Sequence, residues 1–178
     1  MQHKLLMILK REGGNLHILE GEYEGFRYIA ADYHVKVIYH NRDNVLESIK
    51  KIKKNDQFWC SNPNSVNGNL LKDFDQIMEA ISKKGGKVHL DTVYVGTVAK
   101  KYNINLNHKC IYCISWSASK SFPGTFYHRV GAVFFRVNMP EMFGNKWFKN
   151  MSSIRLCICA LSKLTPYNYT QKISKISN

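Results

Sequence analysis

The sequence lacks any long apolar run. No stretch of its 178 residues approaches the ~20 consecutive apolar residues that a helix needs to cross a bilayer. The apolar segment at residues 5–9 is too short for a signal peptide, and no small-residue cleavage site follows it. We therefore expect a cytoplasmic protein with no membrane partner.

Disulfide pairing is also not expected. The five cysteines are an odd number in a chain without an export signal, which argues against a disulfide framework. Cys110 and Cys113 have the spacing of half a zinc site, but Cys157 and Cys159 do not supply a second half with suitable spacing. Both pairs lie in apolar runs that resemble strands. We expect buried thiols and no metal site, with zinc as the less favoured alternative.

Acidic residues are few relative to basic ones. The 13 Asp and Glu face 26 Lys and Arg, so the net charge is +13, and a nucleic acid or a phosphorylated ligand must be considered as a partner. The basic runs at 50–54, 83–84 and 100–101 are scattered, however, and each lies at the end of an expected helix or in a turn. Solvated surfaces explain these runs better than a nucleic-acid groove, so nucleic-acid binding is the less favoured interpretation.

What the chain does contain is a regular alternation of two patterns. Apolar residues make up 44% of the sequence, enough for one substantial core. Short apolar runs alternate with segments of helical period, which predicts a three-layer α/β/α fold with a mostly parallel sheet. Strands are expected at 16–19, 35–40, 57–61, 87–94, 109–117 and 131–137, and helices at 22–33, 44–53 and 70–84.

Three polar segments follow expected strands. They are Ser-Asn-Pro-Asn-Ser-Val-Asn-Gly at 61–68, Asp-Thr-Val-Tyr at 91–94 and Ser-Ala-Ser-Lys at 117–120. Taken singly, they have ordinary explanations as a turn, a helix cap and a solvated lysine. Open parallel sheets bind ligands beyond the carboxyl ends of their strands, so the three segments together predict a ligand site at one sheet edge.

In this order the segments resemble the class I and II, or fold-type I, pyridoxal-phosphate aminotransferases. The large domain of that family carries an Asn-Pro-rich turn, then Asp-x-x-Tyr, then a Ser-rich segment ending in Lys, then Arg and Gly. The resemblance runs from about residue 21 to about residue 131. It implies transfer of an amino group from an amino acid to a keto acid with pyridoxal phosphate as cofactor. It also implies a homodimer or a complementing chain.

The resemblance assigns the central chemistry to two residues. Lys120 would form the Schiff base with pyridoxal phosphate and then move the proton between the substrate α-carbon and the cofactor. Asp91 would pair with the pyridine nitrogen, because a carboxylate there keeps that nitrogen protonated.

Two further residues would contact the phenolic oxygen of the cofactor ring. Tyr94 matches the family tyrosine, and Asn64 is our choice within the Asn-rich turn. The family asparagine falls either there or at the position of Ser65, and Asn62 remains an alternative.

Arg129 and Ser117 would hold the cofactor phosphate. A planar guanidinium suits bidentate binding of phosphate, and a hydroxyl adds a further donor. The interval from Lys120 to Arg129 is one residue longer than the family pattern leads us to expect.

Other parts of the family pattern are not found. Residues 1–12 resemble the tail of the helix that cradles the phosphate, and no glycine-rich turn precedes them. We therefore expect residues 1–140 to be a large domain truncated at both ends, and residues 141–178 an uncertain extension with a frayed tail from 165. Within that extension, 141–151 has helical character and 154–164 is an apolar run of undetermined type. A catalytically inactive remnant or binding module of the same fold is the alternative function.

Overall fold

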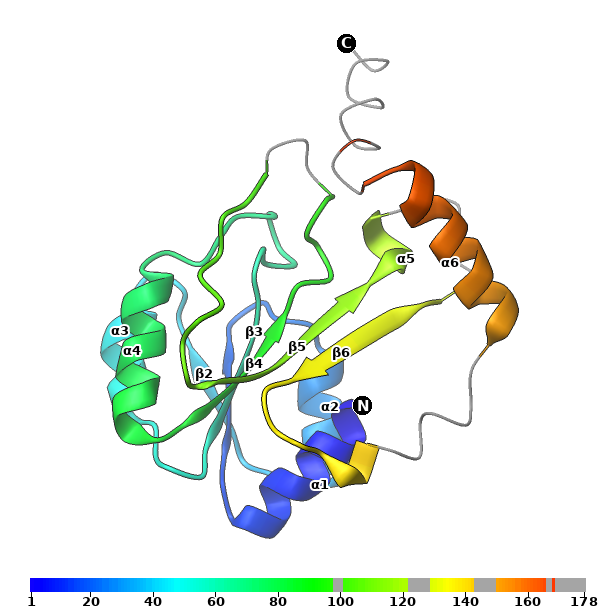
Figure 1. The fold of residues 1–178 in the computed structure, drawn as a ribbon. Helices are drawn as coiled ribbons and strands as arrows, with labels where there is room; N and C mark the ends of the chain where they lie inside the picture. Colours follow the sequence, from blue (N-terminus) through cyan, green and yellow to red (C-terminus); the bar gives the residue numbers. More distant parts are fainter. Residues whose placement is uncertain (98–100, 122–128, 143–149, 166–167, 169–178) are drawn as a thin grey trace.

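A single mixed sheet forms the centre of the molecule (Figure 1). The computed structural model describes residues 1–97, 101–121, 129–142, 150–165 and 168. Its six strands have the order β2-β1-β3-β4-β5-β6, and every neighbouring pair is parallel except β5 and β6. The strands are β1 (Leu16–Leu19), β2 (Val37–His40), β3 (Gln57–Ser61), β4 (Lys87–Asp91), β5 (Ile111–Ser117) and β6 (Gly131–Phe135).

Helices cover both faces of this sheet, as Figure 1 shows. The helices are α1 (Gln2–Glu12), α2 (Gly25–Asp32), α3 (Val45–Ser48), the 3-10 helix η1 (Ile49–Lys51), α4 (Phe74–Lys84), α5 (Ala118–Ser121) and α6 (Met151–Lys163). One apolar cluster joins the sheet to α1 and α2, and a second joins its other face to α3, η1 and α4. The predicted α/β/α architecture is confirmed.

Alternation along β3 shows how the two clusters arise. Phe58 and Cys60 pack in the cluster beneath α4, whereas Trp59 between them packs in the cluster beneath α1 and α2. Every residue of β3 is buried, as expected for a central parallel strand that is covered on both faces. Side chains two positions apart therefore share a face, and this period decides which residues meet at the site.

Several element boundaries differ from those expected. β4 ends at Asp91 rather than at residue 94, because the chain turns there: the Val95 N–H donates to the Thr92 carbonyl at 3.0 Å. The helix expected at 44–53 consists of two short pieces, α3 and η1. The helix expected at 141–151 lies largely outside the described residues, as does most of the tail from 165.

The apolar run at 154–164 belongs to helix α6. Its start is set by Asn150, whose side-chain oxygen accepts a hydrogen bond from the Ser153 N–H at 3.0 Å, the contact made by a helix N-cap. The strand-like interpretation of Cys157 and Cys159 is therefore wrong. Cys157 is buried on α6 and Cys159 is exposed, whereas Cys60, Cys110 and Cys113 are buried in the sheet region.

The turn between α1 and β1 uses two adjacent glycines for different reasons. Gly13 has φ +70°, a left-handed conformation that ends α1, and a Cβ there would meet nothing within 4 Å. A Cβ on Gly14, in contrast, would lie 2.0 Å from the Asn55 carbonyl oxygen.

None of the helices in the described part of the chain is both long and apolar enough to span a membrane.

Candidate functional site

The carboxyl ends of β3, β4 and β5 lie at one edge of the sheet, and the start of β6 joins them there because β6 runs antiparallel to β5. A cavity of about 770 Å³ extends from this edge along β6 to Phe135 and Met139. Of the predicted site residues, Asp91 and Ser117 line it, whereas Tyr94, Lys120, Arg129 and Asn64 are not among its described lining residues. Asp91, Ser115 and Ser117 line it from the strands, and Gln2 of α1 lines it together with the preceding Met1.

Asp91 is the last residue of β4 and lines the cavity. Its Oδ1 accepts a hydrogen bond from the Ser115 hydroxyl at 2.9 Å and one from the Val93 N–H at 3.1 Å. Burial raises the pKa of Asp91, these two donors oppose that rise, and the nearby charge of Glu22 adds to it. Within the described residues no hydrogen bond reaches Oδ2, which is therefore the oxygen available to a ligand.

His89 lies two residues before Asp91 and on the same face of β4. It is fully buried, with its ring 5.0 Å from that of Trp59 and 6.4 Å from that of Phe26. Its Nε2 lies 3.0 Å from the Ser115 hydroxyl. Burial lowers the pKa of His89 to about 3, so the ring is neutral at ordinary pH. Among the buried side-chain polar atoms of the described residues, only His89 Nδ1 has no hydrogen-bond partner.

Tyr94 and Lys120 meet at the same edge. The Nζ of Lys120 lies 5.9 Å from the centre of the Tyr94 ring. Burial raises the pKa of Tyr94, and the charges of Asp91 and Glu22 raise it further, so the three predicted residues Asp91, Tyr94 and Lys120 are electrostatic neighbours. In the part of the chain that the structure describes, no carboxylate pairs with the exposed Lys120.

The predicted phosphate-binding residues follow β5 and precede β6. The Ser117 hydroxyl lies 2.8 Å from that of Ser119 and accepts a hydrogen bond from the Ser119 N–H at 3.2 Å. Ser117 pairs with Gly131 in the sheet register, so the exposed Arg129, two residues before Gly131, is at the same edge. The structure thus brings Arg129 and Ser117 to the side of the sheet that carries Asp91.

The predicted ligand Asn64 makes its side-chain hydrogen bonds within its own loop. Its Nδ2 donates to Asn67 Oδ1 and to the Asn69 carbonyl, both at 2.8 Å. Its Oδ1 accepts from the N–H groups of Val66 and Asn67. Both amide hydrogens of Asn64 are therefore engaged in shaping the turn, and the structure does not present them to the cavity.

The alternative residues differ from Asn64 in this respect. Asn62 accepts a hydrogen bond from the Leu71 N–H at 2.9 Å, and no described residue accepts from its Nδ2. Its backbone N–H donates to the Asp91 carbonyl at 2.9 Å, which places Asn62 directly beside Asp91. The Ser65 hydroxyl donates to the Gly21 carbonyl at 3.3 Å.

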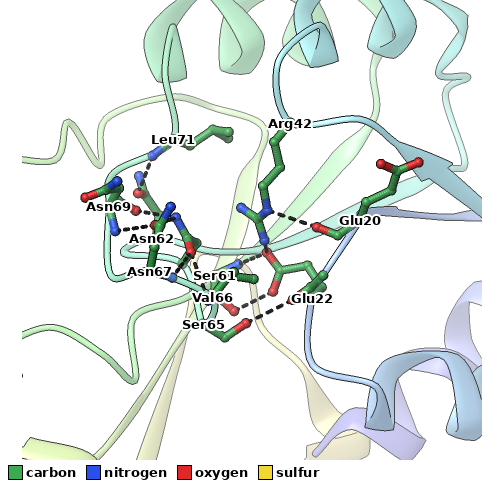
Figure 2. A network of polar contacts seen from close by, with 12 residues as sticks. Glu20, Glu22, Arg42, Ser61, Asn62, Ser65, Val66, Asn67, Asn69 and Leu71 are labelled. Atoms are coloured by element: carbon green, nitrogen blue, oxygen red, sulfur yellow. Dashed lines mark hydrogen bonds and ion pairs between the residues drawn. The ribbon is translucent and has the colours of Figure 1, made fainter.

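A buried ion pair anchors the strand that leads into this loop (Figure 2). Glu22 accepts hydrogen bonds from the Ser61 N–H at 3.0 Å and from the Ser61 hydroxyl at 2.7 Å. Arg42 pairs with the same carboxylate at 3.1 Å and also donates to the Glu20 carbonyl at 2.9 Å. The ends of β1, β2 and β3 are thereby tied together next to the candidate site.

The sequence motifs do not single out His89, Ser115, Glu22 or Arg42. A signal for His89 is present in the sequence, because it lies two residues before Asp91 on one strand and must share its face. The register that sets Ser115 opposite Asp91 was not visible in the sequence. Glu22 and Arg42 lie in loops that follow different strands, and nothing local indicates that they pair.

No protein-family model matches the sequence, and no curated protein matches it. Solved structures are similar in fold. L-threonine-O-3-phosphate decarboxylase from Porphyromonas gingivalis superposes with a TM-score of 0.68 at 16% identity, over 98% of this chain and 55% of that one. An aromatic amino acid aminotransferase from Burkholderia cenocepacia gives 0.61 at 14% identity, over 75% and 39%. Cystalysin from Treponema denticola, which contains a pyridoxal 5'-phosphate cofactor, gives 0.56 at 14%, over 75% and 39%.

These similarities define the fold class. The chain has the aminotransferase-like α/β fold of fold-type I enzymes, as the resemblance in the sequence implied. It spans about half the length of those proteins or less, with 55% and 39% of their chains covered.

Proposed function

We propose that the chain binds pyridoxal phosphate at the carboxyl edge of its sheet and serves amino-group transfer from an amino acid to a keto acid, as an aminotransferase or as a fragment of one. The observation that carries this proposal is Asp91. Its carboxylate lines the cavity with one oxygen held by Ser115 and the other unbonded, beside the strand that ends in Ser117 and leads to Lys120.

The residues present fit this cofactor. A cavity of about 770 Å³ is large enough for a small ligand, since ligand pockets commonly measure about 300–1,000 Å³. Ser117 lines it and the exposed Arg129 lies at the same edge of the sheet, and a guanidinium and a hydroxyl are suitable donors to a phosphate. The unbonded Oδ2 of Asp91 can accept a hydrogen bond from a protonated ring nitrogen.

Different residues of the chain would have different roles in binding the cofactor and moving the proton. Lys120 would hold the cofactor through Nζ and take up and return the proton at the substrate α-carbon. Asp91 would keep a proton on the ring nitrogen by accepting its hydrogen bond. When bound, pyridoxal phosphate supplies an electron sink for the bond broken at that carbon.

The remaining contacts would orient the ring and hold the phosphate. Arg129 and Ser117 would donate to the phosphate oxygens. Tyr94 would donate to the ring oxygen together with an amide of the Asn-rich turn. Because both amide hydrogens of Asn64 are engaged, we assign that second contact to Asn62, whose Nδ2 has no acceptor among the described residues.

An inactive remnant or binding module of the same fold is the second candidate. It is favoured by the amide of Asn64, whose hydrogens are engaged by its own loop and are not presented to the cavity. Nucleic-acid binding, suggested by the net charge of +13, is a third and less favoured candidate.

A cofactor titration tests the proposal. The chain, Lys120→Ala and a control, Lys36→Ala, are titrated with pyridoxal phosphate while the visible absorbance of lysine-bound cofactor is followed. Lys36 is exposed and precedes β2, away from the carboxyl edge. We expect the band in the chain and in Lys36→Ala, and its loss in Lys120→Ala.

Borohydride reduction followed by peptide mass spectrometry then locates the modified lysine. Equal binding by all three proteins, or modification spread over surface lysines, would remove Lys120 from its role. Addition of an amino acid and a keto acid to the loaded chain separates an aminotransferase, which exchanges their amino groups, from an inactive remnant.

A further inference from the structure

We propose that His89 and Ser115 form a buried hydrogen-bond relay that positions the Asp91 carboxylate, with His89 fixed as the neutral tautomer that carries its proton on Nε2. The inference rests on the proposed cofactor-binding role of Asp91. His89 and Ser115 are positioning residues, because they act on the cofactor only through Asp91.

The sheet register brings the three side chains together. His89 and Asp91 are two positions apart on β4 and so share a face, and Asp91 pairs with Ser115 on β5. The result is a continuous chain of contacts, with 3.0 Å between His89 Nε2 and the Ser115 hydroxyl and 2.9 Å between that hydroxyl and Asp91 Oδ1.

Counting hydrogens fixes the direction of the relay. A serine hydroxyl has one hydrogen, and the Asp91 carboxylate can only accept, so Ser115 must donate to Asp91. Ser115 is then left as an acceptor toward His89, so the proton of the neutral ring must lie on Nε2. His89 Nδ1 becomes a bare lone pair, in agreement with its lack of any partner among the described residues.

The surroundings of His89 disfavour its charged form. A second ring proton on Nδ1 would be a buried donor without an acceptor, which is costly. The ring is enclosed by Trp59 and Phe26, and the amino group of Met1 adds a positive charge nearby. A neutral His89 therefore persists over the ordinary pH range.

The relay holds one oxygen of Asp91 and leaves the other for the cavity. Because both hydrogen-bonding roles of the Ser115 hydroxyl are taken, it cannot rotate away from Oδ1. The groups that act on Asp91 from neighbouring elements include the carboxylate of Glu22, which is paired with Arg42, and the hydroxyl of Tyr94. The thiols of Cys60 and Cys113 also lie within its electrostatic reach.

The first test uses the unaltered chain without cofactor. Nitrogen-15 NMR of the histidine rings at about pH 7 reports which nitrogen carries the proton, and pH 7 lies near the unperturbed range of histidine. We expect His89 to show a protonated Nε2 and an unprotonated Nδ1. A protonated Nδ1, or a fully charged ring, would overturn the proposal.

The second test measures the pKa of Asp91 through its carboxyl carbon by NMR. In Ser115→Ala we expect this pKa to rise by about one unit, because a donor to the charged form is removed. Ser115→Thr keeps the hydroxyl and should keep the pKa near that of the unaltered chain. Ser61→Ala is the control, because its hydroxyl is also buried and lies on β3, on the other side of β4, but bonds Glu22.

An unchanged Asp91 pKa in Ser115→Ala would also overturn the relay. If Ser115→Ala does not fold, the tautomer of His89 in the unaltered chain decides the matter. Both readouts are made without cofactor, so a chain with the expected tautomer and pKa that fails to bind pyridoxal phosphate would contradict the proposed function and leave the relay standing.

Discussion

The Glu22 carboxylate has no exposed surface, and among the described residues its donors are Ser61 at the end of β3 and Arg42 in the loop after β2. Arg42 supplies the only cation that pairs with it in the described residues. A buried ion pair contributes little net stability when it is intact, but loss of one partner leaves an uncompensated charge. The pair therefore makes the edge of the sheet sensitive to single substitutions.

We expect Arg42→Met to lower the free energy of unfolding by about 3–5 kcal/mol, the range for breaking a buried pair. Urea denaturation followed by circular dichroism measures the change. The control is Arg27→Met, whose pair with Glu24 is exposed on both sides and should change the free energy of unfolding far less. Adding Glu22→Gln to Arg42→Met should recover part of the loss, and equal effects of the two single arginine variants would contradict the account.

A pair of buried histidines should make the stability of the fold depend on pH. His17 and His40 lie on neighbouring strands with their rings stacked at 5.0 Å and joined by a 2.8 Å hydrogen bond, and His17 also contacts Asp56 at 3.1 Å. Burial lowers the pKa of His40 to about 4, helped by the charges of His17 and Lys51. Burial also lowers the pKa of His17, and Asp56 only partly opposes this.

The sign of the effect follows from proton uptake. The unfolded chain binds a proton at His40 below the usual histidine pKa of about 6.5, whereas the folded chain binds it only near the lowered pKa of about 4, so stability is lost as pH falls through this window. The lowered pKa of His17 acts in the same direction. We expect the urea midpoint to drop between about pH 7 and about pH 5. The drop should shrink in His40→Asn but persist in His3→Asn, whose ring is exposed. Equal pH dependence in both variants would be inconsistent with this origin.

At the scale of elements, the pattern of apolar residues predicts the bounds of those strands that are buried along their whole length. β1 and β3 have the expected bounds, because their apolar runs are buried along their whole length. The apolar pattern of the run at 154–164 does not distinguish a helix from a strand, because short apolar runs of this kind occur in both helices and buried strands. The cap made by Asn150 settles it as a helix, and that cap is a contact that hydrophobic pattern alone does not reveal.

The glycine pair after α1 yields a prediction at this scale. Gly13→Ala should cost about 1–2 kcal/mol, since an alanine must adopt the left-handed conformation but meets no neighbour. Gly14→Ala should cost more, because its Cβ would overlap the Asn55 backbone carbonyl. Thermal unfolding of both variants, with Gly13→Asn as the tolerated control, measures the difference. A smaller loss for Gly14→Ala than for Gly13→Ala would show that the backbone near Asn55 yields easily.

At the scale of the whole molecule, the excess positive charge is dispersed. Lys83 and Lys84 end α4, Lys50 pairs with Glu47 at 2.8 Å, and Lys87 pairs with Glu12 at 2.7 Å. We expect only weak, sequence-independent binding to duplex DNA that disappears between about 50 mM and about 200 mM salt. Fluorescence anisotropy with two unrelated duplexes measures this. Tight binding that survives the higher salt would favour the nucleic-acid alternative.

The sheet edge that carries the candidate site can be predicted from the sequence, but the individual contacts of its residues cannot. Topology alone sends the ends of β3, β4 and β5 to one edge, so Asp91, Tyr94, Ser117 and Lys120 were expected there. The engagement of Asn64 by its own loop and the position of Ser115 opposite Asp91 depend on loop geometry and register. Those are set by tertiary contacts that a single sequence does not display.

The antiparallel pairing of β5 and β6 has a consequence for the extra residue between Lys120 and Arg129. Ser117 is held opposite Gly131 by the ladder, so the location of Arg129 is counted backward from Gly131 and not forward from Lys120. The position of Arg129 relative to Ser117 is thus set by the hydrogen bonds between β5 and β6, and it does not depend on the number of residues between Lys120 and Arg129. Evolution can lengthen or shorten that connection by a residue, and the two strand ends still face each other.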